Sequence, residues 1–406
     1  MKRICFVTSG SLPVPAVRGG AVEQLVQQLC EDNERTSKFE ITCITQYNAE
    51  ALERQHTFRH TKFVNVKTRG KLYYWIIRKV HGLIYRMTGV DNPLVYIYEW
   101  RTNKYLLKHA KDFDLVIAEA CDMMLLKFLS KKIGRERVCL HLHGPFQSTP
   151  QYDRIFGNLL AVSDYIRKNY ISTSNSLPAD RALTLMNGID VSRFSNELPD
   201  AEKVEMRKRI GLDKNDFVVV FCGRIIKEKG VKQLMEAVLS IPNTQVKLLI
   251  IGASNFGNGN KGTYSQEVSD LANRHSDRIF FTGFVKNENL WKYYKLANIG
   301  VTPSMWNEPF CLVLLEMMAS GLPTIATSMG GIPEIATSRT TIFVENDSYI
   351  VHSIREAILN LHSSPSKTKE MSQAAIQRSM QFDRVKYFET FCQQVKYLIE
   401  KNKSRE

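Results

Sequence analysis

Residues 299–323 read IGVTPSMWNEPFCLVLLEMMASGLP. The short apolar run at 299–302 is typical of a buried strand, and the nearly continuous apolar run at 312–318 is typical of a buried helix. Gly321 and Pro323 are residues that commonly end a helix. Because a buried strand leads directly into a buried helix, the segment predicts an α/β fold in which helices cover a mostly parallel sheet.

The same alternation of short apolar runs and helical patterns extends along the whole chain. It predicts strands at residues 4–8, 41–45, 63–66, 115–118, 138–142 and 159–162 and then, after a polar stretch near 188–200, at 217–222, 246–251, 279–282, 299–302, 324–326 and 341–344. Helices are expected at 20–34, 71–88, 99–111 and 122–132. We therefore expect two Rossmann-like domains that face each other across a cleft at the carboxyl ends of their sheets.

The domain limits are expected where the alternation stops and restarts. We place an N-terminal domain at 1–190, a C-terminal domain at 191–382 and a final helix and tail at 383–406. Apolar residues recur at helical spacing within 387–400, so this last helix should pack against another element.

Composition restricts the class of protein and its compartment. The 406 residues are 44% hydrophobic and 24% charged, which excludes a disordered chain. No run approaches the ~18 apolar residues of a membrane-spanning helix, and the apolar run that ends before Thr8 is too short for a secretory signal. The eight cysteines occur singly and never as Cys-x-x-Cys, so we expect buried, reduced thiols in a cytoplasmic protein.

One region carries most of the net charge of +14. Residues 54–111 hold 13 basic and 2 acidic side chains, a surplus of 11. Within this basic region, residues 69–86 place apolar residues at helical spacing among cations and aromatics, which suits a helix lying on an anionic membrane surface. The pattern also suits a helix packed on its own domain with a solvated basic rim. No nucleic-acid-binding module is recognisable, so we expect no nucleic-acid partner.

Glu308 and Glu316 are the candidate site acids of the opening segment. Glu308 stands just before the helix, where a carboxylate also suits the positive end of the helix dipole. Glu316 lies inside an almost wholly apolar helix, where an unpaired carboxylate is costly. The first N–H groups of the helix, expected at Phe310, Cys311 and Leu312, have no partners within the helix and can bind the oxygen atoms of a ligand.

The pattern Glu-x7-Glu, preceded by Pro-Ser and followed by Met-Ala-x-Gly-x-Pro, closely resembles the signature of retaining GT-B glycosyltransferases of glycosyltransferase family 4. Other segments follow in family order, so the resemblance covers essentially the whole chain. It implies a GT-B fold with an acceptor-side N-terminal domain, a nucleotide-sugar-binding C-terminal domain and a last helix returning toward the N-terminal domain. It further implies that Glu308 binds the donor sugar and Glu316 the ribose. Family members commonly carry Gly where Cys311 stands, so this side chain could crowd the donor sugar.

Two loops add candidate ligand-binding residues. Arg224 and Lys229 flank a turn after the strand at 217–222, where two cations can meet a diphosphate or simply face solvent. Gly19 and Gly20 precede a helix and either allow a phosphate or sugar to approach the backbone closely or form an ordinary turn. The resemblance implies that the Arg and the Lys hold the donor diphosphate. It also implies that the glycine pair lies beside the donor phosphates and helps to shape the acceptor site.

His141 and His143 alternate on a strand and should point to the same side. They could belong to a metal site, but no nearby Asp, Glu or Cys completes a ligand set, so we expect no metal. The resemblance implies a histidine near the donor sugar at the end of this strand. His143, beside Gly144, fits that position better than His141, which we interpret as a core residue. The segment Gly330-Gly331-Ile332-Pro333-Glu334 also matches the family, where it implies a turn and helix start beside the nucleotide. Glu334 is expected mainly as an acid at a helix N-terminus, with contact to the ligand as the alternative.

Two motifs are interpreted as fortuitous. Asp112-Phe113-Asp114 spells the Asp-x-Asp of metal-dependent glycosyltransferases, but it leads into a strand, and we expect a loop without a metal. Residues 257–262 spell Gly-x-Gly-x-x-Gly, but they do not follow a strand directly. We therefore expect a flexible loop there and not a dinucleotide site.

These inferences combine into a cytoplasmic, metal-independent, retaining hexosyltransferase that uses a nucleotide diphosphate sugar, expected to be a UDP-sugar, and needs no other cofactor. Arg224, Lys229 and the helix start near Phe310 would stabilise the departing diphosphate. The acceptor is expected to be a hydroxyl of a glycan or lipid-linked molecule in envelope or capsule polysaccharide synthesis, reached at the inner face of the membrane through the basic region.

Two alternatives stay open. A nucleotide-sugar 2-epimerase of the same fold would release nucleotide without any acceptor. A non-catalytic glycan- or nucleotide-binding partner of a transferase would share the fold, but the complete set of acids and cations counts against it.

Overall fold

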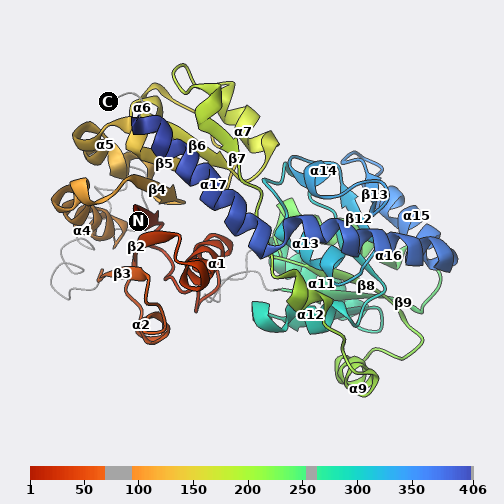
Figure 1. Cartoon of the computed structure of the whole chain (residues 1–406). Coiled ribbons are helices and arrows are strands. Elements are labelled where there is room, and N and C mark those ends of the chain that lie inside the picture. Colours follow the sequence, from red (N-terminus) through yellow and green to blue (C-terminus); the bar gives the residue numbers. More distant parts are fainter. Residues whose placement is uncertain (69–93, 253–262, 404–406) are drawn as a thin grey trace. The chain divides into compact units, whose positions relative to one another are not determined.

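The computed structural model describes residues 1–68, 94–252 and 263–403 (Figure 1). The chain divides into two compact units. Unit 1 comprises Met1–Met186 with Tyr387–Glu406, and unit 2 comprises Asn187–Lys386. In the described part of each unit, neighbouring strands pair in parallel within one sheet. The predicted fold class, two Rossmann-like α/β domains, is confirmed.

The sheet of unit 1 has the strand order β3-β2-β1-β4-β5-β6-β7. Its strands are β1 (Lys2–Thr8), β2 (Phe39–Gln46), β3 (Thr61–Val66), β4 (Leu115–Glu119), β5 (Val138–Leu142), β6 (Asn158–Ala161) and β7 (Ala182–Thr184). The first six lie where the sequence predicts them. The last, β7, has no counterpart among the predicted strands, because three residues are too few to show a periodicity.

Helices connect these strands and cover the sheet. They are α1 (Ala21–Thr36), α2 (Ala49–Gln55), α4 (Leu94–Lys108), α5 (Lys127–Ile133), α6 (Pro150–Asp153) and α7 (Asp164–Ile171), with short 3-10 turns η1 (Ala110–Asp112), η2 (Met123–Leu126), η3 (Arg135–Arg137) and η4 (Ala179–Arg181). The helices predicted at 20–34, 99–111 and 122–132 are confirmed with shifted ends. The one predicted at 71–88 lies outside the described residues.

The sheet of unit 2 has the strand order β10-β9-β8-β11-β12-β13. Its strands are β8 (Phe217–Cys222), β9 (Val246–Ile251), β10 (Ile279–Gly283), β11 (Ile299–Thr302), β12 (Thr324–Thr327) and β13 (Thr341–Val344). All six lie where the sequence predicts them. The helices are α8 (Val191–Ser195), α9 (Asp200–Ile210), α10 (Val231–Leu239), α11 (Thr263–Arg274), α12 (Asn287–Tyr294), α13 (Leu312–Ala319), α14 (Ile332–Ile335), α15 (Ile350–Ser363) and α16 (Pro365–Ser379), with turns η5 (Lys227–Lys229) and η6 (Met380–Phe382).

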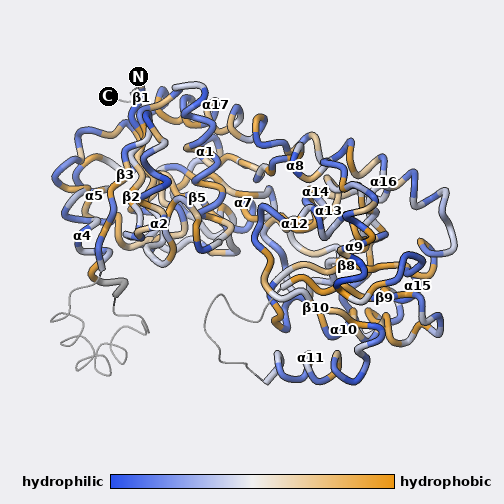
Figure 2. The backbone as a smooth tube through the Cα atoms, turned by 90° about the horizontal axis from the view of Figure 1, so that it is seen from below, coloured by the Kyte–Doolittle hydropathy of each residue, from blue (hydrophilic) through white to orange (hydrophobic). Residues whose placement is uncertain are grey.

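The strands were recognisable because they are buried on both faces. Every residue of β4, β5, β11 and β12 is buried, so these segments do not alternate between apolar and polar residues as half-exposed strands do. Helices on the outside keep polar surfaces: α11 is mostly hydrophilic in Figure 2. Sequence periodicity distinguishes the two kinds of element, because the buried strands lack the polar surface that the outer helices keep.

The last helix, α17 (Arg384–Lys403), completes the core of unit 1 from Tyr387 onward. Phe391 on this helix is fully buried. Its ring centroid lies 5.8 Å from that of Phe6 on β1 and 6.1 Å from that of Phe39 on β2. The C-terminal end of the chain is therefore held on the N-terminal unit by aromatic packing.

No described helix has both the length and the apolar character needed to cross a bilayer. The predicted amphipathic segment at 69–86 lies outside the described residues. Farther along the basic region, Trp100 on α4 is 63% exposed, and the Lys104 ammonium lies 5.6 Å from the centre of its ring.

The packing of α17 predicts the effect of removing its central ring. Phe391→Ala should lower the free energy of unfolding by about 3–5 kcal/mol, because it deletes a fully buried aromatic side chain. Denaturant titration followed by circular dichroism measures the change. Glu389→Ala, an exposed position on the same helix, is the control and should change stability by no more than about 0.5 kcal/mol. Equal effects of the two substitutions would contradict the assigned packing.

Candidate active site

The strand order of unit 2 reverses between β8 and β11, which are neighbours in the sheet. The chain leaves β8 toward β9 on one side and leaves β11 toward β12 on the other. Ligands of α/β proteins bind at such a switch point, outside the carboxyl ends of the strands. The loop after β8 carries Arg224 and Lys229, and the loop after β11 carries Glu308, so topology brings three predicted site residues to this position.

Lys229 and Glu308 form a close ion pair. The Lys229 ammonium lies 2.6 Å from Oε1 of Glu308, and the Ser304 hydroxyl donates to the same oxygen at 2.6 Å. Glu308 is buried, whereas 22% of the Lys229 side chain is exposed. The Lys229 ammonium also lies 5.7 Å from the centre of the Trp306 ring. Arg224 is exposed. The two cations can therefore reach an anionic ligand while Glu308 stays anchored.

Glycine allows the two loops to approach this closely. Gly230 has φ = 67°, and a Cβ atom there would lie 1.9 Å from the carbonyl oxygen of Pro303. The backbone N–H of Met305 donates to the carbonyl of Glu228 at 2.8 Å. A residue with a side chain at position 230 would push the loop bearing Lys229 away from the loop bearing Glu308.

Glu316 is buried on α13, as the sequence predicts, and it has polar partners. Its Oε2 accepts a hydrogen bond from the Tyr294 hydroxyl at 3.0 Å, and its Oε1 accepts one from the Asn287 amide at 3.4 Å. Burial raises the pKa of Glu316 to about 7, although Tyr294 and Arg193 act in the opposite direction. A carboxylate has about four acceptor positions, so Glu316 can still bind ligand hydroxyls.

The helix that carries Glu316 begins later than the sequence predicts. Helix α13 starts at Leu312, so Phe310 lies outside it, buried with its ring 6.0 Å from that of Phe382. Cys311 is the residue before the helix and has φ = 70°, in the left-handed region that favours glycine. The first-turn N–H groups that lack carbonyl partners within the helix are therefore those from Leu312 onward. Burial raises the pKa of the Cys311 thiol to about 12, and the charge of Glu308 acts in the same direction.

In unit 1 the strand order reverses between β1 and β4, and the predicted glycine pair lies in the loop after β1. Gly19 and Gly20 have φ = 79° and φ = 100°, and Gly20 immediately precedes α1. A Cβ at Gly20 would lie 2.2 Å from a carboxylate oxygen of Glu23. The Glu23 side chain could move away, so it is the positive φ of Gly20 that favours glycine at this position.

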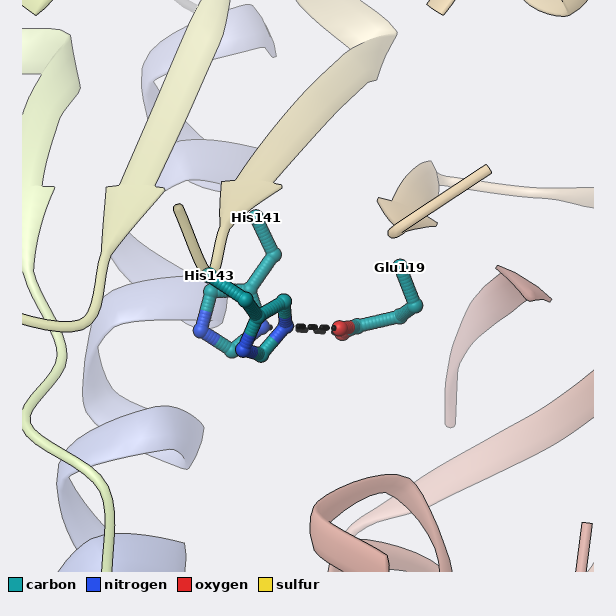
Figure 3. A group of neighbouring side chains, drawn as sticks. All are labelled: Glu119, His141 and His143. Atoms are coloured by element: carbon teal, nitrogen blue, oxygen red, sulfur yellow. Dashed lines mark hydrogen bonds and ion pairs between the residues drawn. The ribbon is translucent and has the colours of Figure 1, made fainter. Parts of the chain in front are cut away.

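His143 and His141 share one carboxylate, as Figure 3 shows. Glu119 accepts from Nδ1 of His141 at 2.9 Å through one oxygen and from Nε2 of His143 at 2.8 Å through the other. The two rings lie on the same side of β5, with centroids 4.2 Å apart. The expectation that no acid lies near the pair is wrong. Glu119 ends β4, and parallel pairing sets it directly opposite His141, which sequence spacing alone does not reveal.

Among the described residues, these three also form a group whose side chains are of the types that bind metal ions. Their ligand atoms lie within 4.8 Å of one another. Two imidazoles and a carboxylate are ligands that zinc and iron accept. The group is thus the place at which metal binding is best tested.

The remaining motifs that lie within the described residues have structural roles. Asp112 ends η1 and pairs with His109 at 2.9 Å, and Asp114 accepts from the backbone N–H of Arg3 at 2.8 Å. Glu334 lies in the first turn of α14. The glycine-rich motif at 257–262 lies outside the described residues.

Comparison with known proteins connects this geometry with an activity. Residues 202–378 match the family model of glycosyl transferases group 1. The chain is 26% identical over 387 residues to spore coat protein SA of Bacillus subtilis, an alignment covering 91% of this chain and 92% of that protein. It is 21% identical to the lipopolysaccharide 1,2-N-acetylglucosaminetransferase of Salmonella typhimurium, with 91% and 93% coverage.

The chain is a glycosyltransferase.

The crystal structure of Anabaena Alr3699/HepE in complex with UDP and glucose superposes on this glycosyltransferase with a TM-score of 0.74. The match covers 98% of this chain and 100% of that chain at 19% identity, which shows a common GT-B fold. The family-model segment of the glycosyltransferase contains Arg224, Lys229, Glu308 and Glu316. His143 lies outside that segment, as do Gly19 and Gly20.

The raised pKa of Glu316 predicts a pH dependence of stability. The folded enzyme holds a proton on Glu316 up to about pH 7, whereas the unfolded chain loses it near its ordinary value of 4.5. The contribution of this group to stability therefore falls as pH rises through this window. Glu316→Gln removes the titration, so its stability relative to the wild type should increase by up to about 3 kcal/mol from pH 4.5 to pH 8.

Denaturant titrations at several pH values measure this difference. Glu345→Gln, an exposed carboxyl in the same unit, is the control and should stay parallel to the wild type. A Glu316→Gln curve parallel to the wild type would show that Glu316 titrates normally.

Proposed function

We propose that the enzyme is a retaining, metal-independent family 4 hexosyltransferase. It transfers a hexose from a nucleotide diphosphate sugar, a UDP-sugar, to a hydroxyl of a glycan or lipid-linked acceptor in cell-envelope polysaccharide synthesis. The observation that carries the proposal is the Lys229–Glu308 pair at the switch point of unit 2, beside the start of α13.

In this proposal, Arg224 and Lys229 bind the diphosphate and stabilise the charge that develops on it as it leaves. Both side chains reach solvent. The N–H groups at the start of α13, which have no carbonyl partners within the helix, add partial positive charge. Such fixed positive groups can perform the role that a divalent cation has in other transferases.

Glu308 and Glu316 bind hydroxyl groups on either side of the diphosphate. Among the described residues, the hydrogen bonds from Lys229 and Ser304 both go to Oε1 of Glu308, so Oε2 is the oxygen assigned to a donor-sugar hydroxyl. Glu316 accepts from the ribose hydroxyls. The resemblance to family 4 further supports assigning His143 to donor-sugar binding and the Gly19-Gly20 loop to donor-phosphate binding.

The comparisons support the choice of donor and pathway. Solved structures of Anabaena Alr3699/HepE contain UDP and UDP-glucose. The similar Salmonella typhimurium protein is a lipopolysaccharide N-acetylglucosaminetransferase. The retaining outcome rests on the resemblance to family 4, with the departing phosphate oxygen taking the proton of the acceptor hydroxyl on the same face of the sugar.

The proposal predicts a loss of turnover when one cation is removed. Lys229→Gln should lower kcat by about 10²–10³-fold, because one fixed positive group no longer stabilises the leaving diphosphate. A panel of nucleotide sugars, screened by thermal stabilisation, identifies the donor, and release of nucleotide measures turnover. Lys227→Gln, an exposed lysine in the same turn, is the matched control and should keep wild-type turnover. Unchanged turnover in Lys229→Gln would refute the assigned site.

We also propose that the basic region attaches the enzyme to anionic membranes. The surplus of 11 positive charges in residues 54–111 and the exposed Trp100 beside Lys104 support this. The wild type should float with vesicles that contain anionic lipids and not with neutral vesicles. Replacing Lys71, Arg78, Lys79 and Arg86 by Gln should weaken partitioning onto anionic vesicles by about 10²–10³-fold, because the four charges contribute roughly 1 kcal/mol each. Equal flotation with neutral and anionic vesicles would contradict the attachment.

A further inference from the structure

Glu119 and the two histidines that it contacts (Figure 3) form a three-residue group within unit 1. The expectation that the chain has no metal site rested on the lack of an acid near these histidines. Pairing of β4 with β5 supplies that acid, because Glu119 lies directly opposite His141. Two imidazoles and one carboxylate are a ligand set that zinc takes in proteins. The fold thus assembles a set of ligands that sequence spacing does not show.

The three side chains already have nearly the spacing that a bound ion requires. A zinc ion lies about 2.1 Å from each nitrogen or oxygen ligand, so tetrahedral ligands lie about 3.4 Å from one another. The Glu119 oxygens lie 2.9 Å from Nδ1 of His141 and 2.8 Å from Nε2 of His143. The ligand atoms of all three residues lie within 4.8 Å of one another. Small side-chain rotations are therefore enough to admit an ion among them.

Hydrogen bonding within the group leaves one buried nitrogen without a partner. In the described part of the chain, Nε2 of His141 is buried and makes no hydrogen bond. Buried polar groups are nearly always paired, and an unpaired one calls for an explanation such as a bound ion. Either nitrogen of a neutral imidazole can bind a metal. The binding capacity of His141 is therefore only partly used by its contact with Glu119.

His143 is the member of the group that solvent can reach. Its side chain is 11% exposed, whereas the side chains of Glu119 and His141 are each 1% exposed. An ion can therefore reach the group beside His143, and a water molecule can occupy a fourth coordination position there. Three protein ligands and one water are the coordination of open zinc sites, whereas structural zinc sites take four protein ligands.

We propose that Glu119, His141 and His143 bind a zinc ion in unit 1, with water as the fourth ligand. Imidazole ligands favour zinc over magnesium and calcium, which prefer oxygen ligands. A ring nitrogen that binds the ion gives up the N–H that it donates to Glu119, and in a neutral ring that proton moves to the other nitrogen. The proposal does not depend on the proposed function, because the cations assigned to the diphosphate lie in unit 2 and transfer takes no ion from unit 1.

Titration of the tag-free, full-length protein with zinc chloride, without nucleotide, tests the site. The wild type should bind one zinc ion with micromolar or tighter affinity, and magnesium chloride should not compete. His143→Ala and Glu119→Gln should each weaken zinc binding by about 100-fold or more, because even the loss of a residue that only orients a ligand costs about 10–100-fold. A wild type that binds no zinc, or variants that bind it as tightly as the wild type, would overturn the proposal.

His109→Ala is the matched control. His109 also pairs with a carboxylate in unit 1, that of Asp112 at 2.9 Å. In the described part of the chain, this pair does not belong to a group of three metal-binding side chains. The variant should therefore bind zinc as the wild type does. An equal loss of affinity in His109→Ala and His143→Ala would contradict the assigned ligands.

X-ray absorption at the zinc edge identifies the ligand atoms in the zinc-loaded wild type, so it decides the question even if a variant fails to fold. The expected shell contains only nitrogen and oxygen, at about 2.0–2.1 Å from the ion. Sulfur at about 2.3 Å would show that zinc is bound by cysteines and would overturn the proposal. The comparison is necessary because Cys139 lies on β5 and Cys121 lies just after β4, and neither forms a disulfide.

Discussion

Each unit has one candidate ligand-binding region, and both regions depend on a reversal of strand order within a parallel sheet. Two neighbouring strands whose chains leave in opposite directions cannot cover their own carboxyl ends, so the loops there are free to bind a ligand. In unit 2 this happens between β8 and β11, and in unit 1 between β1 and β4. The Lys229–Glu308 pair and the Glu119–His143 pair occupy these two positions.

Buried carboxylates at these positions are stabilised in three different ways. Glu308 has a lysine and a hydroxyl as partners, Glu119 has two imidazoles, and Glu316 has a tyrosine hydroxyl and an amide. The imidazoles lower the pKa of Glu119 to about 2, whereas burial dominates at Glu316 and raises its pKa to about 7. Carboxyl groups that are similarly buried thus have different pKa values, because their neighbouring residues differ.

Some elements of the fold could be predicted from the sequence, and others could not. Strands buried on both faces were predictable because continuous apolar runs survive in the sequence, whereas β7 is too short to show a pattern. The first N–H groups of α13 were expected at Phe310, Cys311 and Leu312. In the fold, Cys311 instead adopts a left-handed conformation and the helix begins at Leu312. Packing of Phe310 on Phe382, a residue far along the chain, overrides the local preference.

The sequence alone determined the α/β class and the positions of the described strands other than β7, because apolar periodicity is a local property. It also proposed the acids and cations of unit 2 from a short motif. The role of Glu119 was decided only by tertiary structure. Its partners lie 22 and 24 residues away, and parallel pairing of β4 with β5 brings them together. Periodicity shows that a segment is a strand but not which strand lies beside it, because that depends on the packing of the whole sheet.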